Sequence, residues 1–485
     1  MLASQPPADT MSEYPVRSND FPAARTTVMH FGDPPAKPGP PSVNTPWYRE
    51  LTRYHWFVFV VAALGWLFDT MDQQLFNLAR RTAVAELLKP SPETNADPDT
   101  VSLYAGYATA IFLMGWATGG VAFGVMGDRF GRAKTMVLTI LIYSVCTGLS
   151  ALSRGFWDFS FWRFMTGLGV GGEFAVGISL LAEVMPDRAR PFAIGWLQSL
   201  SAIGNITAAV LSMLISDWRT LFMVGTGPAL LAILIRRKLK EPERWQAIAV
   251  SEDLQRQLGS YKELLGNPRW RRNALAGLGL AFAGVVGLWG IGFFSFDLIR
   301  MVFTQDLQAE GVDPVEIPAR IRWWVGVTSI LQNLGGFAGI QAYMWLTHRT
   351  NRRFAFLVSF LAALASTAFT FAFVGKMSGF YDVLWMIPLM GCCQLSLFGG
   401  YAIYFPELFP TRLRSTGTSF CYSVGRFVAA IGPLTLGLLT KHVFTGYEDP
   451  TQGFRYAGVA MCGFFLLGLV ALPFAPETKG EPLPE

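Results

Sequence analysis

Four ionisable residues lie inside strongly apolar stretches of this chain, where a charge is costly and usually has a function. Asp69 and Asp72 are one helical turn apart in one stretch, and Arg163 and Glu173 share another. Two neighbouring carboxylates resist joint ionisation, so one of them can carry a proton. We therefore predict that these four residues form a site for proton coupling.

Depth in the membrane suggests how the four residues pair. At 1.5 Å per helical residue, Asp69 lies about 10 Å and Arg163 about 8 Å from the same outer end of their helices. This agreement predicts an ion pair between Asp69 and Arg163, with a purely structural salt bridge as the alternative. Glu173, about 22 Å from that end, is either a second proton site or a structural partner.

A fifth charged residue, Arg426, lies near mid-depth, about 18 Å from the inner end of its stretch. An arginine stays charged and matches a carboxylate geometrically, although a structural pairing is the alternative. Polar and aromatic side chains of other central stretches could complete a substrate pocket around it: Asn205, Trp289, Gln332, Asn333, Gln394 and Tyr422.

Such residues need elements that cross a membrane. Of the 485 residues, 52% are hydrophobic and 15% charged, whereas a soluble domain has about 25% charged residues. A spanning helix needs about 20 mostly apolar residues. The sequence predicts an all-α integral membrane protein with twelve transmembrane helices in two six-helix bundles: 56–78, 102–125, 135–152, 158–184, 192–215, 219–235, 274–300, 322–346, 354–374, 380–405, 415–439 and 454–475.

The distribution of basic residues predicts the orientation. Lys and Arg are retained on the cytoplasmic side. The four short loops on one side are dense in Lys and Arg, whereas the longer loops on the other side hold few. We therefore expect the basic side, with both termini, to be cytoplasmic.

Two pairs of charged loops repeat along the chain. "EVMPDRAR" begins at Glu183 and its counterpart "ELFPTRLR" begins at Glu407, while "DRFGRA" at 128–133 has its counterpart in "HRTNRR" at 348–353. The two pairs have nearly the same separation along the chain. Matching loops at matching places predict a duplicated six-helix unit. Tandem halves of this kind bind substrate between them, near the bilayer midplane.

The predicted domains follow from this duplication and from a polar stretch between the halves. Residues 1–50 are rich in Pro and Ser, which favours disorder. We expect a disordered cytoplasmic tail, an N-terminal bundle, a cytoplasmic central loop, a C-terminal bundle and a second cytoplasmic tail: 1–50, 51–235, 236–272, 273–476 and 477–485.

The first charged loop carries a family resemblance. "GVMGDRFGRAK" at 124–134 resembles the loop signature of the major facilitator superfamily, and the resemblance covers residues 51–480. In that family such charges link helix ends on the cytoplasmic face and hold the outward-open state. The resemblance implies this gating role for one set of residues in each half: Asp128, Arg129, Arg132, Glu183 and Arg188 in the first, Arg349, Glu407 and Arg412 in the second.

The second copy of the loop departs from the pattern. His348 stands where Asp128 does, and Asn351 replaces Gly131. Because Asn tolerates the left-handed conformation that Gly provides, we expect the turn to survive while the acid is lost.

Further motifs resemble two branches of the family. "LFDT" at 67–70 is similar to the first-helix acid motif of proton-coupled sugar porters, and "DTMD" at 69–72 fits the D-x-x-D spacing of aromatic-acid symporters. "PETKG" at 476–480 resembles a sugar-porter signature. However, the stretch 274–300 lacks the paired glutamines and the asparagine with which sugar porters hold hydroxyl groups.

The sequence therefore predicts a secondary transporter that carries a small organic anion, aromatic carboxylates included, together with a proton by alternating access in a bacterial inner membrane. A sugar or polyol symporter or facilitator is the main alternative, and a transporter-like solute sensor is a third. Scattered histidines, cysteines without ligand spacing and a net charge of +5 predict no enzyme activity, cofactor, metal or nucleic-acid partner. The expected partners are the substrate, the proton and the lipid bilayer, and we expect a monomer.

Overall fold

All regular elements among the described residues are helices, as the sequence predicts. The structure is a computed structural model that describes residues 46–89, 98–227, 239–250, 257–430, 435, 436, 439, 443, 444, 447 and 449–484. The predicted tail 1–50 therefore lies outside the described residues except for its last five, of which Trp47–Glu50 form a short 3₁₀ helix.

Among the described residues, the first half of the chain has five long helices and one short one. They are α1 (Arg53–Leu87), α2 (Pro98–Phe130), α3 (Arg132–Ala151), α4 (Phe156–Val184), α5 (Arg190–Leu214) and α6 (Trp218–Val224). In the described part of the predicted central loop, two short helices follow: α8 (Glu243–Val250) and α10 (Tyr261–Gly266).

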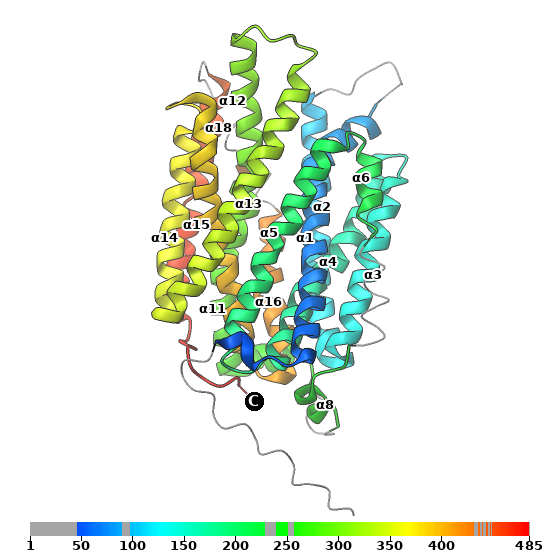
Figure 1. Cartoon of the computed structure of the whole chain (residues 1–485), viewed down its shortest axis with the longest axis vertical. Coiled ribbons are helices and arrows are strands. Elements are labelled where there is room, and N and C mark those ends of the chain that lie inside the picture. The colour runs from blue at the N-terminus through cyan, green and yellow to red at the C-terminus, as the bar shows by residue number, and fades with distance from the viewer. Residues whose placement is uncertain are drawn as a thin grey trace, which may run out of the picture. The chain divides into compact units, whose positions relative to one another are not determined.

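The second half has a matching succession. It contains α11 (Pro268–Val285), α12 (Ser295–Ala309), α13 (Ile317–Arg349), α14 (Arg352–Phe373), α15 (Asp382–Tyr404), α16 (Arg414–Ala429), α18 (Pro450–Met461) and α19 (Phe464–Ala471). Figure 1 shows α8 at the same end of the helices as the C-terminus, with α12 at the opposite end.

Nine segments of the described chain are long and apolar enough to cross a membrane. The remaining three predicted spans correspond to α6, α13 and α16. The predicted spans 219–235 and 415–439 lie partly outside the described residues, and α13, with 33 residues, is long enough to cross but is not among the nine apolar segments.

Two local signals explain helix starts at one end of the molecule. Thr52 caps α1, accepting a hydrogen bond from His55 N at 3.3 Å, while the His55 ring accepts one from Thr52 N at 3.2 Å. Such a reciprocal cap satisfies two backbone donors that a helix start would otherwise leave free. Asn351 caps α14 with its side chain, accepting from Phe354 N at 2.7 Å.

The expectation that Asn351 preserves a left-handed turn is wrong. Gly131, its counterpart, has φ of 110°, but Asn351 has φ of −139°, an extended conformation. The Asn side chain starts the next helix directly by capping it, so the second half needs no left-handed residue there.

Close helix contacts repeat between the halves in the register of the motifs. A Cβ at Gly119 of α2 would lie 1.9 Å from Leu168 O of α4, and one at Gly339 of α13 would lie 1.9 Å from Cys392 O of α15. Gly339 follows Gly119 at the separation of the "HRTNRR" and "DRFGRA" loops, and Cys392 follows Leu168 at that of the "ELFPTRLR" and "EVMPDRAR" loops. The same three-dimensional contact is therefore made twice, once in each half.

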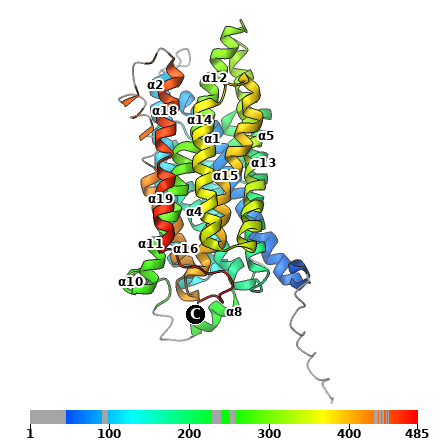
Figure 2. The same ribbon diagram turned by 90° about the vertical axis from the view of Figure 1, so that its left-hand side faces the viewer.

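The two halves contact each other through two pairs of helices, each pair made of one helix from each half. Helix α2 of the first half packs on α16 of the second, and α13 of the second packs on α5 of the first. Between α11 and α12 the chain passes through a π-helical segment, Val286–Ile291, and a 3₁₀ turn, Gly292–Phe294. Figure 2 labels α11 towards the end of the bundles that holds the C-terminus and α12 at the opposite end, and π-helical insertions of this kind bend helices.

Candidate functional site

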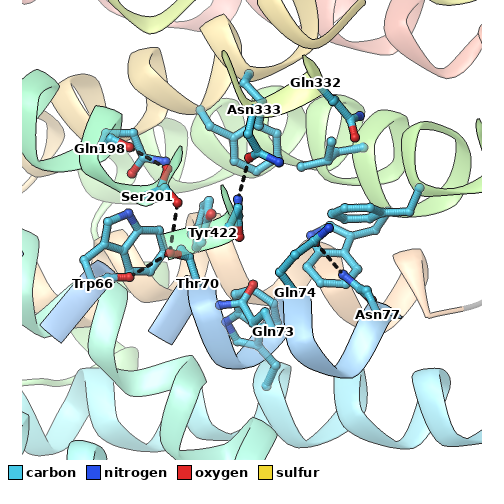
Figure 3. Close-up of a pocket in the computed structure, with 17 residues that line it drawn as sticks. Trp66, Thr70, Gln73, Gln74, Asn77, Gln198, Ser201, Gln332, Asn333 and Tyr422 are labelled. Atoms are coloured by element: carbon cyan, nitrogen blue, oxygen red, sulfur yellow. Dashed lines mark hydrogen bonds between the residues drawn. The ribbon is translucent and has the colours of Figure 1, made fainter. Parts of the chain in front are cut away.

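A cavity lies between the halves, lined by α1, α2 and α5 on one side and by the π-helical segment, α13, α15 and α16 on the other. Its polar wall consists of amides and hydroxyls and its apolar wall is rich in aromatic rings: Trp66, Thr70, Gln73, Gln74, Asn77, Trp116, Gln198, Ser201, Asn205, Leu288, Trp289, Phe293, Gln332, Asn333, Leu395, Phe398 and Tyr422. Figure 3 shows the α1 amides across the cavity from those of α13.

Amide side chains tie the two halves together at this cavity. Asn205 of α5 donates a hydrogen bond to Asn333 of α13 at 2.7 Å, and Gln74 of α1 donates to Ser329 of α13 at 2.8 Å. These side chains offer both donors and acceptors, so a bound molecule can replace the contacts between them.

Most of the residues predicted for a substrate pocket line this cavity. Asn205, Trp289, Gln332, Asn333 and Tyr422 do so.

Two predicted residues, Gln394 and Arg426, are not among the lining residues. Gln394 of α15 donates to Thr367 of α14 at 2.8 Å, so its amide is engaged within one bundle. The cavity side chains Gln73, Gln74, Asn77 and Gln198 were missed by the sequence reasoning. Gln73, Gln74 and Asn77 lie on the turns of α1 that follow Asp69, and this spacing could have indicated that they share the face of the helix that lines the cavity.

Arg426 lies directly behind the aromatic wall of the cavity. Its guanidinium carbon is 3.9 Å from the ring centroid of Trp116 and 3.9 Å from that of Tyr422. The side chain is fully buried. Nη1 donates to Tyr422 O, whereas Nε and Nη2 have no hydrogen-bond partner among the described residues.

The predicted ion pair on α4 involves a different aspartate. Arg163 Nη1 lies 3.7 Å from Asp72 Oδ2, and Asp69 is not its partner. Thr147 of α3 donates to Asp72 at 2.7 Å, and Arg163 donates to Ser150 at 2.9 Å. The expected pairing was wrong because Asp69 and Asp72 differ by a single turn, about 5 Å in depth. That is finer than the uncertainty in helix ends read from sequence.

Asp69 is a fully buried carboxylate whose two oxygens have no hydrogen-bond partner among the described residues. The side-chain amide of Gln73 lies beside it, and the charged groups that act on it come from three helices: Glu173 of α4, Asp72 of α1 and, with the smallest effect, Arg426 of α16. Arg426 is thus the one cation among these groups. Asp69 and Arg426 attract each other electrostatically without making a direct hydrogen bond.

Glu173 occupies a neighbouring buried position on α4. Its Oε2 accepts a hydrogen bond from Thr139 at 2.9 Å, and Oε1 has no partner among the described residues. A Cβ at Gly65 would lie 2.4 Å from that oxygen. The glycine therefore lets the carboxylate lie directly against α1, one turn from Asp69.

Charged residues of the repeated loops converge at one end of the bundles, called the loop face here. Arg132 lies 2.9 Å from Asp128 and 3.0 Å from Glu183, and all three side chains are fully buried. Asp128 also accepts from the backbone N–H of Thr416 at 2.8 Å and from its hydroxyl at 2.6 Å. Asp128 therefore joins α2 to the start of α16, across the two halves.

The second half has a partial copy of this network. Arg352 pairs with Glu407 at 2.8 Å, and these residues are the counterparts of Arg132 and Glu183 in the aligned loops. Arg349, which was predicted for this role, instead lies over the ring of Trp345 at 4.6 Å. The correction follows from the motif alignment itself, in which Arg352 and not Arg349 is the counterpart of Arg132.

The remaining predicted loop residues also lie at the loop face. Arg188 pairs with Glu50 at 2.9 Å, and Arg412 pairs with Glu263 of α10 at 2.8 Å. Arg129 donates to the backbone oxygen of Leu258 at 3.1 Å.

A buried ion pair between the two halves was also not predicted. Arg414 of α16 pairs with Glu183 of α4 at 3.0 Å, and both side chains are fully buried. The last arginine of the second repeated motif supplies this pair.

Comparison with known proteins identifies the family. The family model described as Major Facilitator Superfamily matches residues 62–313, which is more than half of the chain. The chain belongs to the major facilitator superfamily. Its fold also resembles this transporter family's proton:xylose symporter XylE bound to 6-bromo-6-deoxy-D-glucose, with a TM-score of 0.66 at 16% identity over 89% of this chain and 98% of that one.

Two relatives of this major facilitator protein span nearly its whole length. A putative metabolite transport protein of Haemophilus influenzae is 26% identical, covering 90% of this chain and 99% of the relative. The cis,cis-muconate transport protein of Acinetobacter baylyi is 28% identical, covering 87% of this chain and 95% of the relative.

Proposed function

We propose that this protein is a proton-driven symporter of a small organic anion, a carboxylate with a flat or aromatic body. The observation that carries the proposal is Arg426, a buried guanidinium behind the aromatic wall of the cavity, two of whose donor nitrogens have no hydrogen-bond partner in the part of the chain that the structure describes. A carboxylate that enters past Tyr422 would meet a cation suited to hold it, because guanidinium groups match carboxylates in geometry and charge.

Asp69 supplies the proposed coupling to the proton. While Asp69 is ionised, it offsets the charge of Arg426, with which it interacts. When it is protonated, the positive charge of Arg426 is no longer offset, and a substrate anion is attracted to it. Because such coupling is reciprocal, the bound anion also favours the protonated form of Asp69. Proton and anion would then cross together.

Two other features fit the same cycle. Glu173 packs against α1 next to Asp69, and we propose that it is a second site that binds the proton during transport. The loop-face residues Asp128, Glu183 and Arg414 join the halves and are proposed to close this side while the cavity opens to the other. The basic character of the loop face favours a cytoplasmic location for it, and we propose a monomer in a bacterial inner membrane.

The name of one relative supports the substrate class. A relative named for cis,cis-muconate transport, at 28% identity, carries an unsaturated dicarboxylate. The aromatic rings of Trp116, Trp289, Phe293 and Tyr422 suit a flat, conjugated body of that kind.

Uptake into proteoliposomes tests the proposal. Labelled cis,cis-muconate and labelled benzoate are the acidic probes, and xylose is the neutral one, each with and without a pH gradient. We expect accumulation of at least one acid that requires the gradient and is lost in Arg426→Gln. Gradient-driven accumulation of xylose with no uptake of either acid would instead support the second candidate.

That second candidate is a sugar or polyol symporter. The amides of the cavity favour it, since Gln73, Gln74, Asn77, Gln332 and Asn333 could hold hydroxyl groups. Arg426 separates the two candidates, because a neutral substrate has no need of a buried cation and Arg426→Gln should then leave its binding nearly unchanged.

A further inference from the structure

Two neighbouring arginines, Arg80 and Arg81, lie just beyond the cavity on the side away from the loop face. Arg80 and Arg81 are in the last third of α1, which runs from Arg53 to Leu87. Arg80 follows the cavity residue Asn77 by three positions, and Arg81 follows it by four. Both arginines therefore lie one helical turn beyond the cavity.

Asp297 of α12 faces these two arginines from the other half. It follows the cavity residue Phe293 by four positions, so it too lies about one turn beyond the cavity. Its carboxylate is 3.9 Å from Arg80 and 3.6 Å from Arg81. The contact thus bridges α1 of the first half and α12 of the second, about one turn from the cavity on the side away from the loop face.

Asp297 makes a shorter contact with an arginine of its own helix than with Arg80 or Arg81. Arg300 donates to Asp297 at 3.0 Å, whereas the contacts with Arg80 and Arg81 are too long for hydrogen bonds. If α1 and α12 separate, Asp297 keeps Arg300. Arg80 keeps its hydrogen bond to the hydroxyl of Thr109 on α2, at 3.0 Å.

From this arrangement we infer that Arg80 and Arg81 form an entrance site for the carboxylate of the substrate, a place that Asp297 fills when the far side is closed. The inference rests on the proposed function, because it requires an anionic substrate. An arriving carboxylate would replace Asp297 beside the two arginines, and would then pass one turn deeper to the cavity. The hydrogen bond from Arg80 to Thr109 holds one of the two cations in position for this exchange.

If the substrate carboxylate replaces Asp297 in this way, substitutions of Arg81 and of Asp297 should change the KM in opposite directions. Arg81→Gln, with a side chain 41% exposed, removes an attractive charge and should raise the KM for carboxylate uptake about threefold to tenfold at low salt, with Vmax nearly unchanged. Asp297→Asn removes the competing carboxylate and should lower KM. Arg81→Lys should keep a KM close to that of the wild type.

Three comparisons make the test specific. The KM of Arg81→Gln should depend less on ionic strength than that of the wild type, because an attraction between exposed charges is screened by salt. Arg320→Gln makes the same charge change at an exposed far-side position, where Arg320 pairs with Glu316 at 2.9 Å, and should leave KM unchanged. Uptake measured from the loop-face side, in vesicles of the opposite orientation, should also be unaffected.

Several outcomes would overturn the inference. A purely structural latch between α1 and α12 predicts that Arg81→Gln and Asp297→Asn shift KM in the same direction. An equal effect of Arg320→Gln would indicate a general surface charge. Gradient-driven acid uptake with the wild-type KM in Arg81→Gln would overturn this inference alone, whereas a protein that carries only neutral sugar would overturn the proposed function as well.

Discussion

Asp69 and Asp72 lie on successive turns of α1 but have different surroundings. Asp72 has a hydroxyl partner at 2.7 Å and an arginine at 3.7 Å. Asp69 has neither, and both of its oxygens are buried without a hydrogen-bond partner among the described residues. A carboxylate that changes charge during transport should be the one without fixed partners, which favours Asp69 for the proton.

Asp69→Asn should abolish accumulation driven by a pH gradient, because the amide imitates the protonated carboxyl and cannot release a proton. Exchange of labelled for unlabelled substrate between equal pools should continue, since Arg426 and the cavity stay in place. Both rates are measured in the same proteoliposomes. Uphill accumulation at the wild-type rate would show that another group, with Glu173 the first candidate, carries the proton.

Asp72→Asn should act on folding more than on coupling. It leaves Arg163 fully buried without its carboxylate, and breaking a buried ion pair from one side costs about 3–5 kcal/mol. We expect a clear fall in the thermal unfolding temperature in detergent and a lower yield of folded protein. The double variant Asp72→Asn, Arg163→Gln should recover part of that loss, and no recovery would contradict the pairing.

At the scale of helices, small residues set the distance between neighbours. Gly119→Ala on α2 would place a Cβ 1.9 Å from Leu168 O, and Gly339→Ala on α13 would place one 1.9 Å from Cys392 O. A backbone carbonyl cannot relieve such a clash by changing rotamer, as a side chain can. Each substitution should therefore destabilise the protein by about 1–3 kcal/mol or more. Gly106→Ala on α2, with nothing within 4 Å of its Cβ, is the matched control and should be neutral or slightly stabilising. Thermal unfolding in detergent measures all three, and equal unfolding temperatures would contradict the close contacts.

The C-terminal segment is held to α14 by a carboxylate. Burial alone would raise the pKa of Glu477, but the backbone N–H groups of Arg352, Arg353, Thr478 and Lys479 donate to it and lower its pKa on balance. A lowered pKa in the folded state stabilises the protein above the unfolded pKa of about 4.3 and loses this contribution as the pH falls through the folded value.

Glu477→Gln should therefore lower the unfolding temperature at pH 7, by an amount corresponding to about 0.3–1 kcal/mol for an anion at a helix start. The difference from the wild type should shrink as the pH falls below about 4. Thermal unfolding followed at several pH values measures both. A difference that stays constant from pH 7 to pH 3 would show that the charge of Glu477 is not what holds the segment.

At the scale of the whole molecule, periodic and repeated features were predictable and single partners were not. Apolar length and the nearly equal separations of the repeated loops predicted an all-α membrane fold with matching halves, because these features depend on the averaged pattern of many residues. The partner of Arg163 was predicted wrongly, because Asp69 and Asp72 lie only one helical turn apart and helix ends read from sequence are less certain than that. The amides of the cavity were also missed in part, because lining depends on how the two halves are packed together.

The loop-face contacts between the halves should decide which side of the transporter is closed. Asp128 accepts three hydrogen bonds from Ser415 and Thr416 at the start of α16, at 2.6–3.2 Å. Hydrogen bonds to a charged group contribute about 1.5–3 kcal/mol each, so Asp128→Asn should move the balance towards a loop-face-open conformation by roughly tenfold or more.

In Asp128→Asn, spin labels at the exposed positions Asp187 and Arg349, one in each half, should show a larger population at long distances. Glu316→Gln, which removes an acid paired with Arg320 at 2.9 Å, should leave the distance distribution unchanged. Equal distributions for wild type and Asp128→Asn would mean that the ion pair between Glu183 and Arg414 is sufficient to keep the loop face closed.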